Sequence, residues 1–180
     1  MQSVPETGSG LEVSRRRWLP WLWLPAVVAL VAVAVWWARH PAPLPLTDST
    51  VTASPKVGQR VYLGATRSDL EARDLAISST SFRTADSSTD GLDVDGLEVE
   101  AWICRDGAIS QTTDPSRFCA DVLPAEGNTL HLGGGDQLML SVESPTPVAL
   151  VLDPVEVAYR DGLQWGTDRI GSEFEVVVIG

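Results

Sequence analysis

Residues 97–104 read LEVEAWIC, and this stretch decides the fold class. Apolar and polar side chains alternate along it, with Val99, Ala101 and Ile103 on one side and Glu98, Glu100 and Trp102 on the other. A period of two is typical of a half-buried β-strand, because successive side chains of a strand point to opposite faces. Asp95-Gly96, directly before the stretch, is a two-residue hairpin signal. The stretch therefore predicts a strand that is entered through a hairpin.

The same period recurs on both sides of this strand, from Val57 to the end of the chain. We expect further strands at 61–63, 74–83, 129–132, 137–143, 148–152, 154–160, 163–166 and 173–179. Turn signals such as Asp106-Gly107 and Asp161-Gly162 separate short strands at regular intervals. Residues 57–180 are therefore predicted to form an all-β domain, an immunoglobulin-like antiparallel β-sandwich of about eight or nine strands.

Before the predicted domain, residues 18–38 read WLPWLWLPAVVALVAVAVWWA, which is 21 residues without a charge. At 1.5 Å per residue, a helix of this length spans roughly 30 Å, the thickness of the hydrocarbon core of a bilayer. Arg15, Arg16 and Arg17 precede it, and the side richer in arginine stays in the cytoplasm. We therefore predict a cytoplasmic tail at 1–17, a single transmembrane helix at 18–38 and a C-terminal domain outside the cell membrane.

Two other interpretations of the same stretch stay open. Ala32-Val33-Ala34 matches the cleavage site of a secretory signal peptide, although the apolar run continues past it through Trp37. Residues 14–19, SRRRWL, resemble a twin-arginine export signal. All three interpretations place the rest of the chain outside the cytoplasm.

Residues 39–56, RHPAPLPLTDSTVTASPK, are predicted to be a linker. Pro41, Pro43 and Pro45 alternate with other residues, which favours extended polyproline II structure. The Ser/Thr-rich remainder is typical of a flexible spacer.

The charge of the predicted domain limits its partners. From Val57 onward the chain has eight Arg and no Lys against 21 Asp and Glu residues. Such an acidic domain is not expected to bind nucleic acid, whose phosphates are negative. The charge is typical of a surface that keeps a protein soluble.

The two cysteines of the chain, Cys104 and Cys119, are predicted to form a disulfide if the domain is exported, because the outside is oxidising. Closing a loop of about 15 residues stabilises a fold by roughly 3 kcal/mol in chain-entropy theory. A metal site is disfavoured, because His131 is the only further nitrogen ligand in the domain.

Residues that could carry chemistry are few. No G-x-S-x-G pattern is present, and His131 is the sole imidazole of the domain. Asp90, Asp93 and Asp95 in STDGLDVDG are similar to part of a calcium loop, but the EF-hand spacing fails at both ends. No cofactor is predicted.

The sequence therefore favours a binding or structural module of the cell envelope that is not an enzyme. Its expected partners are the lipid bilayer, through residues 18–38, and another envelope protein. Trp165, next to a turn, and Phe118, in the disulfide loop, are the candidate partner-binding residues. Two alternatives are a small envelope hydrolase that uses His131 and a weak calcium-binding domain at Asp90, Asp93 and Asp95.

Overall fold

The computed structural model describes residues 19–67, 70–84 and 96–180, with side chains from Trp23 onward. The chain divides into two compact units, Met1–Trp36 and Trp37–Gly180. Helix α1 (Leu19–Ala38) has Pro25 in its interior. Among the described residues, no helix is both long and apolar enough to cross a membrane. The transmembrane assignment of residues 18–38 stays a prediction from the sequence, and the predicted tail at 1–17 lies outside the described residues.

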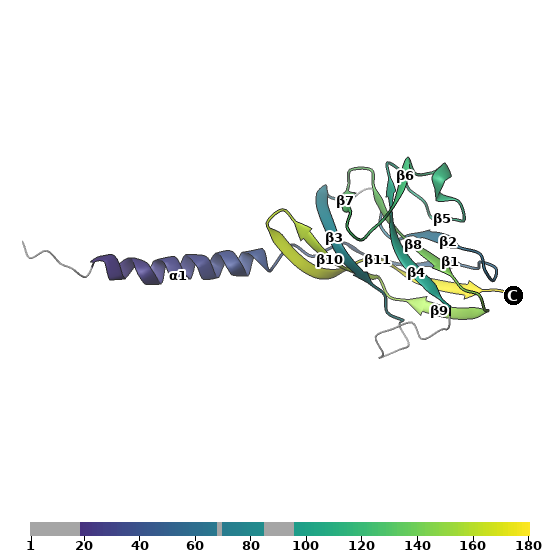
Figure 1. The fold of residues 1–180 in the computed structure, drawn as a ribbon, viewed down its shortest axis with the longest axis horizontal. Coiled ribbons are helices and arrows are strands. Elements are labelled where there is room, and N and C mark those ends of the chain that lie inside the picture. Colours follow the sequence, from purple (N-terminus) through teal and green to yellow (C-terminus); the bar gives the residue numbers. More distant parts are fainter. Residues whose placement is uncertain (1–18, 68–69, 85–95) are drawn as a thin grey trace, which may run out of the picture. The chain divides into compact units, whose positions relative to one another are not determined.

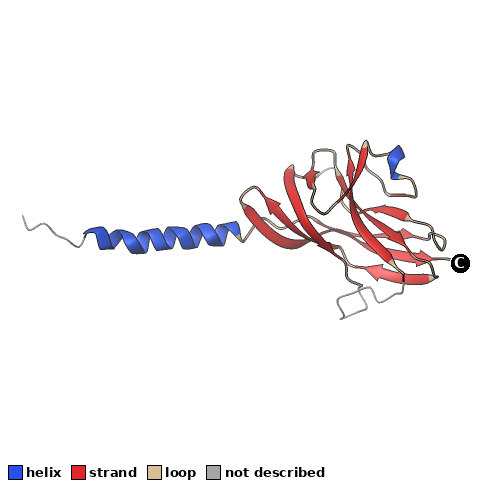
Figure 2. Ribbon diagram, viewed as in Figure 1, coloured by secondary structure: helices blue, strands red, loops and turns tan. Residues whose placement is uncertain are grey.

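The second unit is a β-sandwich of two sheets (Figures 1 and 2). The six-stranded sheet has the order β1-β11-β10-β3-β7, with β9 also paired to β11. Its strands are β1 (Leu46–Ala53), β3 (Arg73–Ser81), β7 (Thr129–Leu132), β9 (Val148–Leu152), β10 (Val155–Asp161) and β11 (Gln164–Val178). The prediction of an all-β sandwich is confirmed.

The five-stranded sheet has the order β5-β2-β8-β4-β6. Its strands are β2 (Val61–Gly64), β4 (Glu98–Arg105), β5 (Gln111–Thr112), β6 (Asp121–Pro124) and β8 (Gln137–Glu143). A 3-10 helix, η1 (Pro115–Arg117), lies between β5 and β6. The described residues thus contain eleven strands, more than the eight or nine expected, because β1, β5 and β6 lie in segments that read as linker or loop.

Strand β11 joins two predicted strands into one of 15 residues. Its first half pairs with β10, and its second half pairs with β9 on one edge and with β1 on the other. Gly171 lies at the change of partners with φ of +92°, a conformation that favours glycine. A Cβ atom at this position would lie 2.4 Å from the carbonyl oxygen of Ala65, so glycine also permits the close approach of the opposite chain segment.

Strand β1 corrects two predictions. Leu46–Ala53 lies within the predicted linker, yet it pairs in parallel with β11, with Thr50 opposite Glu173 and Ala53 opposite Val176. The linker assignment is wrong for these residues, and the sandwich is not purely antiparallel. The segment resembles a spacer because β1 is an edge strand with mostly exposed Ser and Thr side chains, held by backbone pairing and by the buried Ala53.

The predicted proline-rich linker also contacts the sandwich before β1 begins. We call residues 37–45 the strap. Leu44 is buried in the core, and its backbone N–H donates to Asp168 Oδ2 at 2.9 Å. The carbonyl oxygen of Pro45 accepts from the N–H of Gly171 at 3.1 Å. The strap is therefore part of the folded domain.

The main core fills the space between the sheets. It includes Phe174, Leu63, Leu75, Ile103 and Leu140, all with essentially no exposure. Ala101 and Ile103 are buried as the alternation in residues 97–104 predicts. Strand β8 is buried on both faces because a second apolar cluster, described below, covers its outer side.

Candidate binding groove

A groove with a volume of about 430 Å³ opens at one edge of the sandwich, between the end of β3 and the start of β4. Residues from both sheets line it: Thr80, Phe82, Val99, Glu100, Ala101, Trp102, Pro124 and Glu126. Segment 85–95, which joins β3 to β4, lies outside the described residues.

Part of the β4 backbone at the groove has no paired strand among the described residues. Strand β8 pairs with all of β4 up to Cys104, whereas β6 pairs only with Trp102–Arg105 on the other side. The carbonyl oxygen of Ala101 points to the β6 side, because it accepts from the N–H of Ala125 at 2.9 Å. Since backbone groups alternate along a strand, the N–H and C=O of Val99 point the same way. Within the described residues, no strand pairs with them, so the described part of the sandwich leaves this edge of β4 open.

Apolar side chains line part of the groove, and contacts hold Trp102 and Phe82 in place. The indole Nε1–H of Trp102 donates to Ser141 Oγ at 3.0 Å. The ring of Tyr62 meets the Trp102 ring edge to face, with centroids 6.4 Å apart. Phe82 packs against the main core. An apolar ligand side chain would therefore meet a preformed surface.

Two carboxylates also line the groove. Glu126 Oε1 accepts from the backbone N–H of Thr80 at 2.8 Å and from its hydroxyl at 3.0 Å. Glu100 Oε2 accepts from Arg60 Nη1 at 3.2 Å. Both glutamates are exposed. The rim of the groove therefore carries negative charge.

Arg60 neutralises only part of that charge. Glu98 and Glu143 lie directly opposite each other on β4 and β8, an unfavourable pairing of like charges. The Arg60 guanidinium bonds to both at 2.8 Å and also to Glu100. The hydrogen bond that Arg60 Nε donates to Glu143 is the main cause that raises the pKa of Arg60 above its ordinary value. One cation among three carboxylates leaves this region negative.

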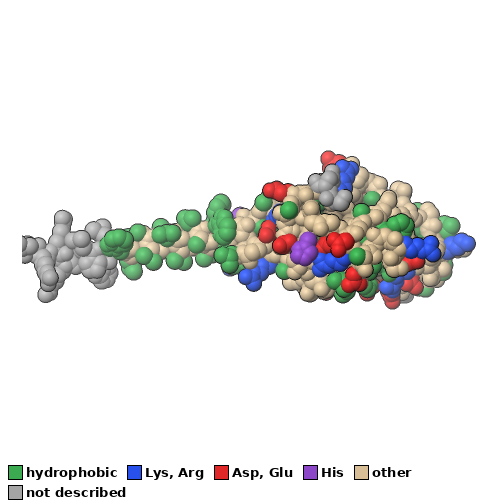
Figure 3. All heavy atoms as spheres, turned by 90° about the horizontal axis from the view of Figure 1, so that it is seen from above, with side chains coloured by type: hydrophobic (Ala, Val, Ile, Leu, Met, Phe, Trp, Pro, Cys, Tyr) green, Lys and Arg blue, Asp and Glu red, His purple; other side chains and the backbone are tan. Residues whose placement is uncertain are grey.

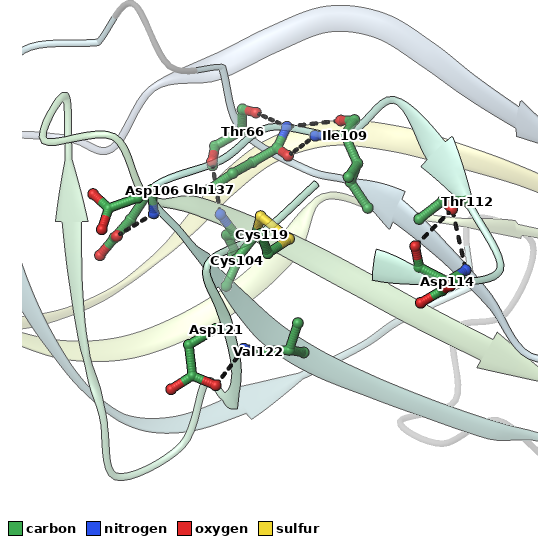
Figure 4. Close-up of a disulfide and its surroundings, with 12 residues drawn as sticks. Thr66, Cys104, Asp106, Ile109, Thr112, Asp114, Cys119, Asp121, Val122 and Gln137 are labelled. Atoms are coloured by element: carbon green, nitrogen blue, oxygen red, sulfur yellow. Dashed lines mark hydrogen bonds between the residues drawn. A yellow bond between two sulfur atoms is a disulfide. The ribbon is translucent and has the colours of Figure 1, made fainter. Parts of the chain in front are cut away.

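The predicted disulfide between Cys104 and Cys119 is present, with the two Cα atoms 5.1 Å apart (Figure 4). Both cysteines are buried in the second apolar cluster, which also contains Ile109 and Met139. This cluster lies on the outer face of the five-stranded sheet. The disulfide loop therefore forms a small second core instead of an open loop.

Gln137 fastens the disulfide loop to the sheet (Figure 4). Its Nε2 donates to the carbonyl oxygens of Thr66 at 2.7 Å and Ile109 at 3.0 Å. Its Oε1 accepts from the N–H of Ile109 at 2.6 Å. The amide is buried and pairs with three backbone groups, as buried polar groups require.

The two predicted partner-binding residues lie apart from the groove and from each other. Trp165 is on β11 of the six-stranded sheet, and 51% of its surface is exposed. Phe118 follows η1 beside the five-stranded sheet and is 54% exposed. Neither residue lines the groove. They do not form one surface together.

His131 lies on β7, where its Nδ1 is 2.6 Å from Asp74 Oδ1. Both side chains are exposed, and within the described residues no hydroxyl group hydrogen bonds to the imidazole ring. On the face of the sandwich that Figure 3 shows, acidic side chains lie close to basic ones, and hydrophobic side chains are scattered. The contact between His131 and Asp74 is one of several polar side-chain contacts on the surface of the sandwich.

The calcium prediction concerns residues that the structure does not describe. Asp90, Asp93 and Asp95 all lie in segment 85–95, as does most of the predicted hairpin before β4. Across the described ranges, no group of three or more His, Cys, Asp or Glu side chains is placed to hold a metal ion.

Sequence reasoning missed the groove, although one signal was available. Trp102 follows Glu98 and Glu100 on the polar side of the strand, where a large aromatic residue indicates a covered or ligand-binding surface. Its neighbours Phe82, Pro124 and Glu126 come from other segments, which only the folded chain brings together.

Comparisons with known protein families, curated proteins and solved structures find no match.

Proposed function

We propose that this protein is a membrane-anchored binding module of the cell envelope, and that the groove beside Val99 takes an extended segment of another envelope protein. In this proposal residues 18–38 cross the cell membrane, and the acidic sandwich lies outside. The sandwich serves as an immunoglobulin-like scaffold in the loose sense, with two packed sheets that present a binding edge. The role is not enzymatic.

The edge of β4 at Val99, with which no described strand pairs, is the observation that carries the proposal. An extended peptide can add a strand to such an edge through backbone hydrogen bonds, while its side chains enter pockets on either face. Phe82 and Trp102 would receive apolar side chains of the peptide. Glu100 and Glu126 favour a segment that also carries Lys or Arg, because opposite charges steer association. The proposed ligand is therefore an extended segment with alternating apolar and basic residues.

Binding is tested with two synthetic octapeptides, one that alternates Val with Lys and one that alternates Val with Glu. We expect the Val–Lys peptide alone to shift the backbone amide signal of Val99 in NMR spectra, with saturation and with weaker binding at high salt. Glu126→Lys should weaken this binding, whereas Glu175→Lys should not, because Glu175 is exposed on the other sheet. Equal responses to both peptides, or no response at Val99, would contradict the groove assignment.

The envelope partner is tested in intact cells. A photo-crosslinking residue at Glu100 should yield a defined heteromeric product whose crosslink maps to an extended basic segment, and the same residue at Glu175 should not. Recovery of the monomer alone from both positions would count against a partner at the groove.

The membrane anchor rests on the sequence of residues 18–38, which is uncharged and has tryptophans at both ends. We expect the full-length chain to stay with membranes after an alkaline carbonate wash, and a variant without residues 18–38 to be released. We also expect protease added outside spheroplasts to reach the sandwich. Release of the full-length chain by carbonate would overturn the anchor.

A further inference from the structure

The hairpin of β10 and β11 carries two of the most exposed large apolar side chains of the sandwich at or beside its turn. Leu163 is 70% exposed and Trp165 is 51% exposed. Asp161 pairs with Gln164 across the turn, so Gly162 and Leu163 form its tip. Figure 1 shows this hairpin at one end of the sandwich. We call residues 160–165 the hairpin tip.

The hairpin tip is tied to the strap. Gln164 Nε2 donates to the backbone carbonyl oxygen of Trp37 at 2.9 Å. Leu163 and Trp165 are the sequence neighbours of Gln164, and their Cα atoms lie about 3.8 Å from its Cα atom. Both residues are therefore held close to Trp37. Gly166 on the same strand leaves room for Pro41, since a Cβ atom there would lie 2.8 Å from its Cγ. The fold thus places the hairpin tip beside Trp37, the first residue of the second compact unit.

The charges around the hairpin tip suit a lipid surface. Arg160 lies directly opposite Trp165, and its Nε donates to the carbonyl oxygen of Gly162 at 2.7 Å, which keeps the guanidinium at the tip. Arg39 follows Trp37 by two residues. The nearby carboxylate of Asp161 is paired with Arg73 at 2.9 Å. Cations beside exposed Trp and Leu are typical of segments that sit among lipid headgroups.

We propose that the hairpin tip is a second membrane contact, in which Leu163 and Trp165 enter the headgroup region of the bilayer and Arg160 meets lipid phosphates. This inference rests on the proposed anchor, because Trp37 reaches the membrane surface only if residues 18–38 cross the bilayer. Tryptophan prefers this region, since its ring is apolar and its N–H stays hydrated. The contact would hold the sandwich at the membrane surface, in addition to the covalent tether.

The experiment uses the full-length protein in vesicles of phosphatidylcholine and phosphatidylglycerol. Both native cysteines are in the disulfide, so a single added cysteine carries a fluorescent label at Leu163→Cys or at Trp165→Cys. Ala149→Cys is the matched control, because Ala149 is exposed on β9 beside the far end of β11. The measurement is quenching of each label by lipids that carry a spin label at the headgroup.

We expect severalfold stronger quenching at both tip positions than at Ala149→Cys. The same samples are washed with carbonate and floated, which reports the anchor independently of the label. Vesicle-bound protein with equally weak quenching at all three positions would overturn the hairpin contact and leave the anchor standing. Failure to float would overturn the anchor, and with it the contact. Thermal unfolding of each labelled variant confirms that the tip substitutions leave the domain folded.

Discussion

At the scale of single residues, buried polar side chains hold together segments that are distant in the sequence. Gln137 bonds to Thr66 and Ile109, which lie 71 and 28 residues away. Nothing in the neighbouring sequence of Gln137 indicates these partners. Such contacts appear only when the loops fold back over the sheet.

We expect Gln137→Leu to lower the free energy of unfolding by about 3 kcal/mol, because it leaves three buried backbone groups without a partner. Urea unfolding measures the change. Gln111→Leu on the exposed β5 position should alter stability by only about 0.5 kcal/mol. Similar effects of the two substitutions would contradict the role assigned to the Gln137 amide.

The raised pKa of Tyr159 leads us to expect that the protein becomes less stable at alkaline pH. Burial is the main cause that raises the pKa of Tyr159 above its ordinary value of 10.0. The folded protein therefore holds this proton more tightly than the unfolded chain does, so unfolding becomes easier as the pH rises above about 10. The stabilising contribution of the protonated Tyr159 hydroxyl is fully present below that pH. It is lost as the pH rises through the raised pKa of the folded protein.

Urea unfolding between pH 9 and pH 11 tests this expectation, with the range set by the ordinary tyrosine pKa of about 10. Tyr159→Phe should remove part of the decrease in the free energy of unfolding that occurs at alkaline pH. Tyr62→Phe is the matched control, because Tyr62 is the only other tyrosine of the chain. If Tyr159→Phe leaves the pH dependence unchanged, burial of this hydroxyl does not govern it.

At the scale of elements, the change of partners along β11 decides how the six-stranded sheet is built. The strand changes partners at Gly171, from β10 in its first half to β9 and β1 in its second half. Strands β9 and β10 lie end to end along one edge of β11, separated by Asp153 and Pro154. A single long strand thus connects the hairpin tip to the C-terminal edge.

Gly171→Ala should lower the free energy of unfolding by roughly 3 kcal/mol or more. The substitution adds backbone strain at positive φ and also places a Cβ atom against the Ala65 carbonyl. Gly162→Ala, with φ of +58° and open space around it, should cost only about 1 kcal/mol. Chemical denaturation of both variants makes the comparison, and equal losses would show that packing against Ala65 is unimportant.

The disulfide loop is a second element with a measurable effect. Cys104→Ala combined with Cys119→Ala should reduce stability by about 3 kcal/mol, because the unfolded chain regains the freedom of a loop of about 15 residues. Adding a reductant to the unaltered protein should give a similar loss. If neither the double substitution nor the reductant changes the midpoint of thermal unfolding, the second apolar cluster holds the loop without the disulfide.

At the scale of the whole molecule, the folded domain begins earlier than the sequence suggests. The second compact unit starts at Trp37, and the strap and β1 both belong to it. The boundary predicted at Val57 therefore cuts through the sandwich. It removes the buried side chains of Leu44 and Ala53 together with the backbone pairing of β1 with β11.

A fragment of residues 37–180 should fold cooperatively, whereas a fragment of residues 57–180 should be less stable by roughly 3 kcal/mol or more, given the burial of Leu44 and the lost pairing. Circular dichroism during urea unfolding compares the two. Equal stability would show that the strap and β1 dock without contributing to the fold.

The sequence by itself determined the features that depend on near neighbours. Alternation in residues 97–104 predicted a strand with a buried face, repeated alternation predicted the all-β class, and two cysteines in one loop predicted their bridge. Each of these follows from side-chain direction or from chain closure over a short distance. The membrane anchor, the binding role and the calcium alternative stay predictions or proposals.

The tertiary structure alone decided the rest. It placed the Ser/Thr-rich β1 in parallel beside β11, joined two expected strands at Gly171, and brought Phe82, Val99 and Trp102 to one groove. It also placed Leu163 and Trp165 beside Trp37, more than 120 residues earlier in the chain. These outcomes depend on which distant segments pair. Local alternation records only which face of a strand is buried, so it does not identify the partner that covers that face.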